Sequence, residues 1–224
     1  MSHLNLAVVD ADGAIREAAE TAGLDRSDFL KKGAVAGGGL LVGSAMFSGI
    51  LSSAEAAIST TRKSASNDVK VLNYALTLEF LEAAFYEQAV ANQAYGTSAA
   101  LKQFAEIVAV HERKHVNFLK GALGAKAIKS PAFDFGDAVT DPAKFAATAQ
   151  VLEDTGVAAY LGQVGNISAK GTLAAAATIT TVEARHAGWI RNINGELGAP
   201  LSFDKRKSER TILKAVGETG FIKA

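Results

Sequence analysis

The chain has 224 residues, of which 49% are hydrophobic and 21% are charged, so it is long enough to bury one substantial core. Lysine plus arginine and aspartate plus glutamate both total 23, and this balance gives no indication of nucleic-acid binding. Cysteine is absent, which excludes disulfides and thiolate metal sites and leaves any metal site to histidine and carboxylate ligands.

The first 56 residues have the features of a targeting segment. Residues 33–54 form an uncharged run that follows basic residues and precedes small ones, an arrangement typical of a signal peptide. The preceding segment RSDFLK (26–31) resembles the twin-arginine export signal, with Ser27 in place of the second arginine. We therefore predict an exported protein, periplasmic, cell-surface or extracellular, whose mature form starts near Ile58. A membrane anchor retained through residues 33–54 is the alternative.

From residue 67 onward, apolar residues recur at helical spacing in four blocks separated by glycine, proline or serine. Asn67 or Asp68 is the expected N-cap of the first helix. The spacing predicts helices over residues 68–92, 98–123, 141–167 and 172–197, and a short tail helix over 204–216.

The longest connection, residues 125–140, lies between the second and third predicted helices and indicates a crossover along the bundle. The predicted fold class is therefore all-α, a four-helix bundle with a long crossover between helices two and three. Residues 57–200 are assigned to the bundle and residues 201–224 to a tail. The first helix also has a second apolar face, which packs either on the hairpin partner or in a homodimer. This face consists of Val71, Tyr74, Leu78, Leu81 and Phe85.

A chemical pattern occurs twice along the four predicted helices. Each half has a glutamate followed by a tyrosine seven positions later and, in the next helix, a Glu-x-x-His pair. The residues are Glu79, Tyr86, Glu112 and His115 in the first half, and Glu153, Tyr160, Glu183 and His186 in the second. The pattern indicates an internal two-fold repeat of a helical hairpin.

The repeated glutamates and histidines have the spacing of metal ligands. Residues three, four and seven positions apart share one helix face, so these side chains lie on inward apolar stripes. A buried, ionised carboxylate without a partner has a large desolvation cost, which a metal ion offsets. Four carboxylates and two imidazoles match the ligand count of a bundle site for two iron or two manganese ions.

Four segments, LNYALTLEFLEAAFYEQA, HERKHVNFL, FAATAQVLEDTGVAAYLG and TVEARHAGWIR, resemble the ferritin-like superfamily of di-iron carboxylate proteins over residues 67–195. More narrowly, they resemble its exported and desiccation-related bacterial members. The resemblance implies Glu112 and Glu183 as bridging ligands, and Tyr86 and Tyr160 as hydrogen-bond donors to the ligands or as oxidisable neighbours. It implies one ion on Glu79, Glu112 and His115, and the other on Glu153, Glu183 and His186. It also implies chemistry with dioxygen or peroxide in stress protection.

Two other functions are weighed against this one. The segment from His111 to His115 spells H-E-x-x-H, the zinc-protease helix in which both histidines bind zinc and Glu112 is the general base. A non-catalytic stress protein, in which the metal only stabilises the fold, is the other alternative. If two ions bind as the repeat suggests, His111 lies outside the ligand set but near it.

Glu82 lies one turn after Glu79 on the same helix face. It is an extra ligand or proton relay in one interpretation. The favoured interpretation is an ion pair with a basic residue, namely Arg113, Lys114 or Arg185.

Overall fold

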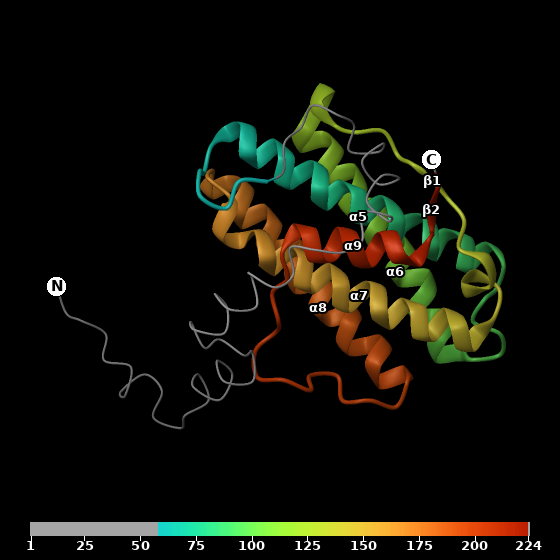
Figure 1. Cartoon of the computed structure of the whole chain (residues 1–224). Helices are drawn as coiled ribbons and strands as arrows, with labels where there is room; N and C mark the ends of the chain where they lie inside the picture. Colours follow the sequence, from blue (N-terminus) through green and yellow to red (C-terminus); the bar gives the residue numbers. More distant parts are fainter. Residues whose placement is uncertain (1–57, 224) are drawn as a thin grey trace, which may run out of the picture.

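Four long helices make up most of the structure, a computed structural model that describes residues 58–223. Helix α5 (Ala65–Ala91) packs along α6 (Ala99–Leu123), and α7 (Pro142–Gln163) packs along α8 (Lys170–Ile193), which gives two helical hairpins (Figure 1). A shorter helix, α9 (Glu209–Thr219), lies against α7. This arrangement confirms the predicted all-α four-helix bundle.

The predicted signal segment lies outside the described residues, and so does the uncharged run 33–54. Between residues 58 and 223, no helix is both long enough and apolar enough to span a membrane.

Capping side chains set the start of most helices. Ser98 and Ser208 accept hydrogen bonds from the first turns of α6 and α9, and Asp141 does the same for α7, where Pro142 takes the first helical position. The predicted cap of the first helix was wrong, because Ser64 caps α5 instead. The helix therefore begins three residues earlier than the sequence pattern indicated.

The two residues predicted as that cap instead join the two hairpins. The Asp68 carboxylate accepts hydrogen bonds from the backbone nitrogens of Ser168 at 2.7 Å and Ala169 at 2.9 Å. Ala169 occupies the N-cap position of α8 and has no capping side chain of its own. Asn67 donates to the carbonyl oxygen of Asn166 at 3.1 Å. These bonds satisfy backbone groups at the start of α8 and fix it against α5.

The connection between α6 and α7 runs along the bundle, as predicted (Figure 1). It begins with the 3-10 helix η1 (Gly124–Lys126) and ends with η2 (Gly136–Val139). Between them, strand β1 (Ala132–Phe133) pairs antiparallel with β2 (Ile222–Lys223) of the tail. A third 3-10 helix, η3 (Val164–Asn166), follows α7. The strand pair was not predicted, because two residues are too short to show a strand pattern in the sequence.

The tail packs directly on the backbone of α7. The backbone nitrogen of Lys207 donates to the carbonyl oxygen of Ala158 at 3.0 Å. A Cβ atom at Gly162 would stand 1.9 Å from the carbonyl oxygen of Lys207, so only glycine permits this approach.

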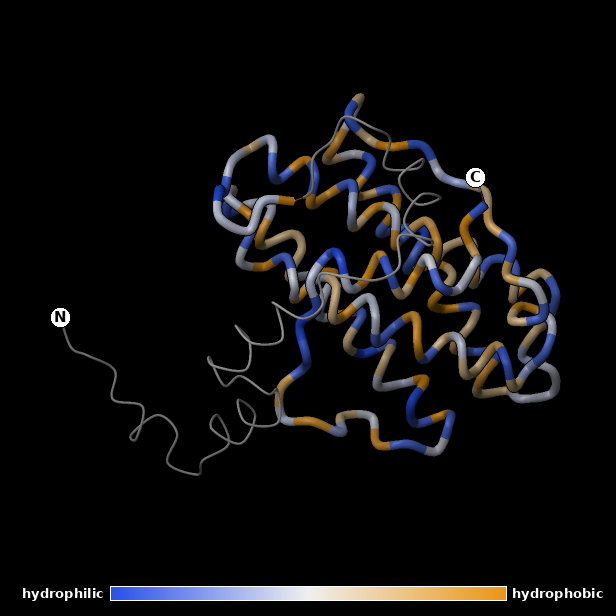
Figure 2. The backbone as a smooth tube through the Cα atoms, viewed as in Figure 1, coloured by the Kyte–Doolittle hydropathy of each residue, from blue (hydrophilic) through white to orange (hydrophobic). Residues whose placement is uncertain are grey.

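The apolar core lies between the two hairpins. Hydrophobic and hydrophilic residues succeed one another along each helix (Figure 2). Of the two alternatives for the second apolar face of α5, the structure shows packing within the chain. The residues of this face are buried in the core, namely Val71, Tyr74, Leu78, Leu81 and Phe85. Within this core, the rings of Phe85 and Phe145 stack with centroids 5.4 Å apart.

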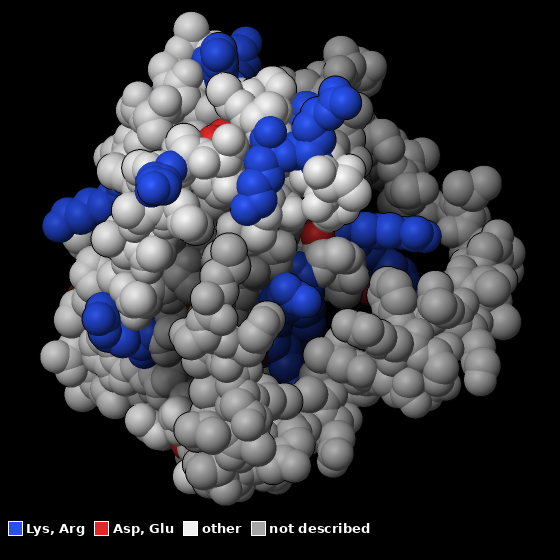
Figure 3. All heavy atoms as spheres, turned by 90° about the vertical axis from the view of Figure 1, so that its left-hand side faces the viewer, with Lys and Arg blue, Asp and Glu red and all other residues white. Residues whose placement is uncertain are grey.

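Acidic and basic side chains are divided unequally between the interior and the surface. From residue 57 onward, the chain has 19 lysines and arginines and 16 aspartates and glutamates. Five of the glutamates are buried between the helices, namely Glu79, Glu82, Glu112, Glu153 and Glu183. The exterior therefore has an excess of basic residues, and the charged side chains visible on the face in Figure 3 are mainly lysines and arginines. The equal totals of acidic and basic residues in the sequence therefore did not show that acidic side chains gather in the interior.

Candidate metal centre

The six predicted ligands come from all four bundle helices and converge in the interior. Helix α5 supplies Glu79, α6 supplies Glu112 and His115, α7 supplies Glu153, and α8 supplies Glu183 and His186. The four glutamates are fully buried, and the side chains of His186 and His115 are 3% and 13% exposed. Because the pairs on α6 and α8 are three residues apart, both members of each pair lie on the inward helix face.

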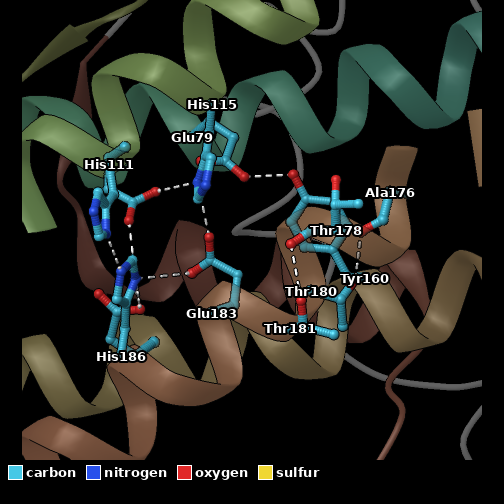
Figure 4. Close-up of polar contacts among 12 residues, drawn as sticks. Glu79, His111, His115, Tyr160, Ala176, Thr178, Thr180, Thr181, Glu183 and His186 are labelled. Carbon is cyan, nitrogen blue, oxygen red and sulfur yellow. Dashed lines mark hydrogen bonds and ion pairs between the residues drawn. The ribbon is translucent and has the colours of Figure 1, made fainter. Parts of the chain in front are cut away.

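The first ligand group surrounds His115. Its Nδ1 lies 3.0 Å from Oε2 of Glu112, 3.0 Å from Oε1 of Glu183 and 3.3 Å from Oε2 of Glu79. Figure 4 shows the His115 ring between Glu79 and Glu183. One ligand atom from each of the four residues lies within 4.8 Å of the others, which is close enough to hold one metal ion.

The second ligand group surrounds His186. Its Nδ1 lies 3.1 Å from Oε1 of Glu112, 3.4 Å from Oε2 of Glu153 and 3.7 Å from Oε2 of Glu183. Glu112 and Glu183 belong to both groups, and each turns one oxygen toward His115 and the other toward His186. The structure thus brings together all six predicted ligands, with the two predicted bridges between the groups.

Several donor atoms of the site form no hydrogen bond with any described residue. Buried polar atoms are normally hydrogen-bonded. Several of these atoms are fully buried without a hydrogen bond to any described residue: Glu79 Oε2, Glu112 Oε1, Glu153 Oε2, both oxygens of Glu183, and His186 Nδ1. A set of carboxylate oxygens and imidazole nitrogens in this state fits a pair of cations such as iron or manganese.

The ionisation of the site shows what a cation would replace. Burial lowers the pKa of His115 and His186, but the surrounding carboxylates outweigh burial and raise both pKa values to about 12. Burial raises the pKa of Glu183, but the two histidines outweigh it and lower the pKa to about 2. In the metal-free chain, two protonated imidazoles therefore supply the positive charge. Metal binding would displace those protons.

Two tyrosines connect the halves of the site. The Tyr86 hydroxyl on α5 donates to Oε1 of Glu153 at 2.5 Å, and the Tyr160 hydroxyl on α7 donates to Oε1 of Glu79. Both were predicted as donors to the ligands, and the structure adds that each serves the glutamate of the other half. Because the hydroxyl occupies Oε1, Oε2 of each glutamate remains free to face a histidine.

His111 supports His186 from outside the ligand set. Its Nδ1 lies 2.9 Å from Nε2 of His186, and the two rings stack with centroids 5.1 Å apart (Figure 4). Burial, followed by the charge of His186, lowers the pKa of His111, so we assign His111 as the acceptor and Nε2–H of His186 as the donor. His186 then keeps Nδ1 for a metal, the arrangement in which an outer partner orients a ligating imidazole.

The zinc-protease arrangement is not formed among the described residues. It would require His111 and His115 to hold one ion, but neither ligand group includes His111. The prediction that His111 lies beside the site without being a ligand agrees with this geometry.

The prediction that Glu82 forms an ion pair was wrong. Arg113 instead pairs with Glu87, with 2.6 Å between Nη2 and Oε2. Glu82 is 3% exposed and forms no hydrogen bond or ion pair with any residue from 58 to 223. Burial, and then the charges of four neighbouring glutamates, raise its pKa well above the usual value. The sequence signal for its actual surroundings was its position one turn after Glu79, on the same inward face of α5.

A family comparison agrees with this geometry. The ferritin-like domain family matches residues 67–196, which is more than half of the chain. The chain belongs to the ferritin-like domain family. A search of curated proteins finds no match. The superfamily resemblance is therefore confirmed, and the narrower resemblance to exported and desiccation-related members stays a prediction.

Proposed function

We propose that this ferritin-like protein binds two iron or two manganese ions and uses them to oxidise iron or to consume peroxide, as an exported protein in stress protection. The observation that carries the proposal is the shared pair Glu112 and Glu183, whose oxygens divide between the two histidines. Carboxylates placed in this way hold two cations side by side. One glutamate from each of two helices and a Glu-x-x-His pair from each of the other two is also the ligand pattern of di-iron and di-manganese bundles.

The charges of the predicted ligands support a pair of ions over a single one. Four ionised carboxylates carry four negative charges, which two divalent cations neutralise. A single divalent cation would leave half of this charge uncompensated in a site whose glutamates are fully buried. When bound, paired iron or manganese ions supply electron transfer to and from dioxygen or peroxide.

The protein groups around the ions orient the ligands and limit access of water. Tyr86 and Tyr160 hold Glu153 and Glu79 by one oxygen each. The side chain of His115, which is 13% exposed, is the most accessible of the six ligands. We therefore expect the oxidant to approach from the side of His115.

Export is the part of the proposal that rests on the sequence alone. Its support is the uncharged run 33–54 after the segment that resembles a twin-arginine signal. Mass spectrometry of the secreted or membrane-bound protein is expected to give a mature chain that starts near Ile58. A chain that keeps Met1 and stays in the cytoplasmic fraction would contradict export.

The metal content of the full chain tests the central claim. Protein purified from cells supplied with iron or manganese is expected to hold two ions per chain. The iron-loaded protein, prepared without oxygen, should then consume added peroxide or dioxygen faster than the same concentration of free iron. One zinc per chain, or no bound metal, would contradict the dinuclear centre. Two ions without faster consumption would leave a non-catalytic, stabilising role.

A further inference from the structure

The internal repeat is broken at one position beside the metal centre. The paired glutamates and the paired tyrosines of α5 and α7 are each 74 positions apart in the sequence. The same separation takes Glu82 to Gly156. At this position, one half of the repeat has a carboxylate and the other half has no side chain.

Gly156 leaves the space in which the Glu82 carboxylate lies. A Cβ atom at position 156 would stand 3.2 Å from Oε1 of Glu82 and 3.6 Å from Oε2 of Glu183. The first distance is tighter than an ordinary contact, and the second is an ordinary van der Waals contact. The Glu82 carboxylate therefore lies against the backbone of α7, beside a carboxylate that belongs to both ligand groups.

No described side chain compensates the Glu82 carboxylate. It is 3% exposed and lacks a hydrogen bond or ion pair within residues 58–223. An ionised carboxylate in a core is stable only with a charged or hydrogen-bonding partner, and otherwise it takes up a proton. The two ligand groups beside it are where a positive charge would enter.

Glu82 lies outside both ligand groups of the metal-free chain. We propose that it becomes a fifth carboxylate ligand when the metal pair binds, from the space that Gly156 leaves for it, and that it makes the two metal positions inequivalent. This inference rests on the proposed two-ion centre. Four carboxylates neutralise two divalent ions, so a fifth adds one negative charge, which is balanced when one of the ions is trivalent. Glu82 therefore favours the oxidised state of the pair.

A titration of the metal-free full chain with Co²⁺ tests ligation without relying on activity. The visible absorption of Co²⁺ depends on its ligand number, and the titration also gives both dissociation constants. Glu82→Gln keeps the shape of the side chain and removes its charge. For Glu82→Gln, we expect the dissociation constant of the more weakly bound Co²⁺ ion to rise about tenfold or more. We also expect the visible spectrum of Co²⁺ to change. The matched control is Glu87→Gln on the exposed side of the same helix, which should titrate like the unchanged chain.

The role of Gly156 is tested by a double-mutant cycle. Gly156→Ala places a methyl group against the Glu82 carboxylate and should weaken Co²⁺ binding in the same direction as Glu82→Gln. In a Glu82→Ala background the carboxylate is gone, so Gly156→Ala should have no further effect on Co²⁺ affinity. Equal effects of Gly156→Ala in both backgrounds would show that it acts independently of Glu82.

Thermal unfolding separates ligation from packing. If Glu82 binds metal, Glu82→Gln should leave the melting temperature of the metal-free chain unchanged or raised, and should lower that of the Co²⁺-loaded chain. A packing role would lower both. In the iron-loaded chain, Glu82→Gln should also raise the midpoint reduction potential, because the trivalent ion loses a negative neighbour.

Two results overturn the inference. Either Glu82→Gln binds two Co²⁺ ions with unchanged affinities and spectrum, or it lowers the melting temperature equally with and without metal. If the unchanged chain itself fails to bind two ions, the dinuclear centre fails, and with it the basis of this inference. The unchanged chain therefore distinguishes the two failures.

Discussion

The two hairpins supply equivalent ligands but surround them differently. In the hairpin of α5 and α6, the His115 side chain is 13% exposed. In the hairpin of α7 and α8, His186 is 3% exposed and its outer nitrogen is bonded to His111. The 71 positions that separate the two Glu-x-x-His pairs also separate His111 from Val182, so the repeat has no second supporting imidazole.

This difference separates the part of the repeat that the proposed pair of cations would require from the part that can vary. The glutamates and histidines match in both halves, as the proposed pair of ions requires, because each ion would need carboxylates and an imidazole. The positions around the ligands differ, as at Glu82 and Gly156. We therefore expect two bound ions with unequal affinity and unequal access to solvent, with the ion at His186 held more firmly.

Replacing Glu112 and Glu183 together by alanine should have the largest effect, because it removes the residues that both halves share. We expect both ions to be lost from the purified protein, as measured by elemental analysis. The control replaces Glu87 and Glu106, exposed glutamates of α5 and α6, and should keep two ions per chain. Undiminished iron or manganese in the first variant would contradict the site assignment.

The pH dependence of the stability of the metal-free chain tests the surroundings of Glu153 in the α7–α8 hairpin. Burial raises the pKa of Glu153 to about 7, although His186 opposes the shift. The folded state then binds more protons than the unfolded state, so stability falls as pH rises from about 4.5 to about 7. The expected loss from this residue is about 3 kcal/mol, measured by urea unfolding. Glu153→Gln should reduce the change of the unfolding free energy between about pH 4.5 and pH 7. An unchanged pH dependence would contradict the raised pKa of Glu153.

Replacing His111 by alanine should reduce the difference in affinity between the two proposed metal positions. Because His111 orients only His186, we expect one of the two ions to bind about 10- to 100-fold more weakly while the other is unaffected. The matched control is Val182→Ala at the equivalent place in the other half. Isothermal titration with Mn²⁺ measures both affinities. Equal weakening of both ions would argue against a role confined to one half.

Replacing a tyrosine tests whether its hydroxyl binds the glutamate of the other half, and this change has the smallest expected effect. Tyr86→Phe removes a buried hydrogen bond and should cost about 1 kcal/mol of stability. Its effect should be coupled to Glu153→Gln and independent of Glu79→Gln in double-mutant cycles followed by urea unfolding. Coupling to Glu79 instead would mean that the tyrosine serves its own half.

Much of the fold and of the site could be predicted from local patterns. The 3.6-residue period of a helix places Glu112 and His115 on one face, whatever the rest of the chain does. The same argument applies to the second pair and to the apolar stripes, so the four helices, the crossover and six converging side chains were predictable. The export signal and the domain boundary near residue 57 remain predictions.

Other features depended on which helix faces which. The pattern placed Tyr86 on the face of Glu79, but packing brought its hydroxyl to Glu153. The favoured interpretation of the sequence gave Glu82 a basic partner, but Arg113 lies on the exposed side beside Glu87.

The sequence by itself therefore determined the helices and the inward faces on which the six predicted ligands lie, because both follow from the spacing of residues along a single helix. Only the tertiary structure decided that Glu112 and Glu183 divide their oxygens between two histidines, and that Gly156 makes room for Glu82. Those contacts join different helices, and their geometry is set by how side chains from all four helices fill one shared interior.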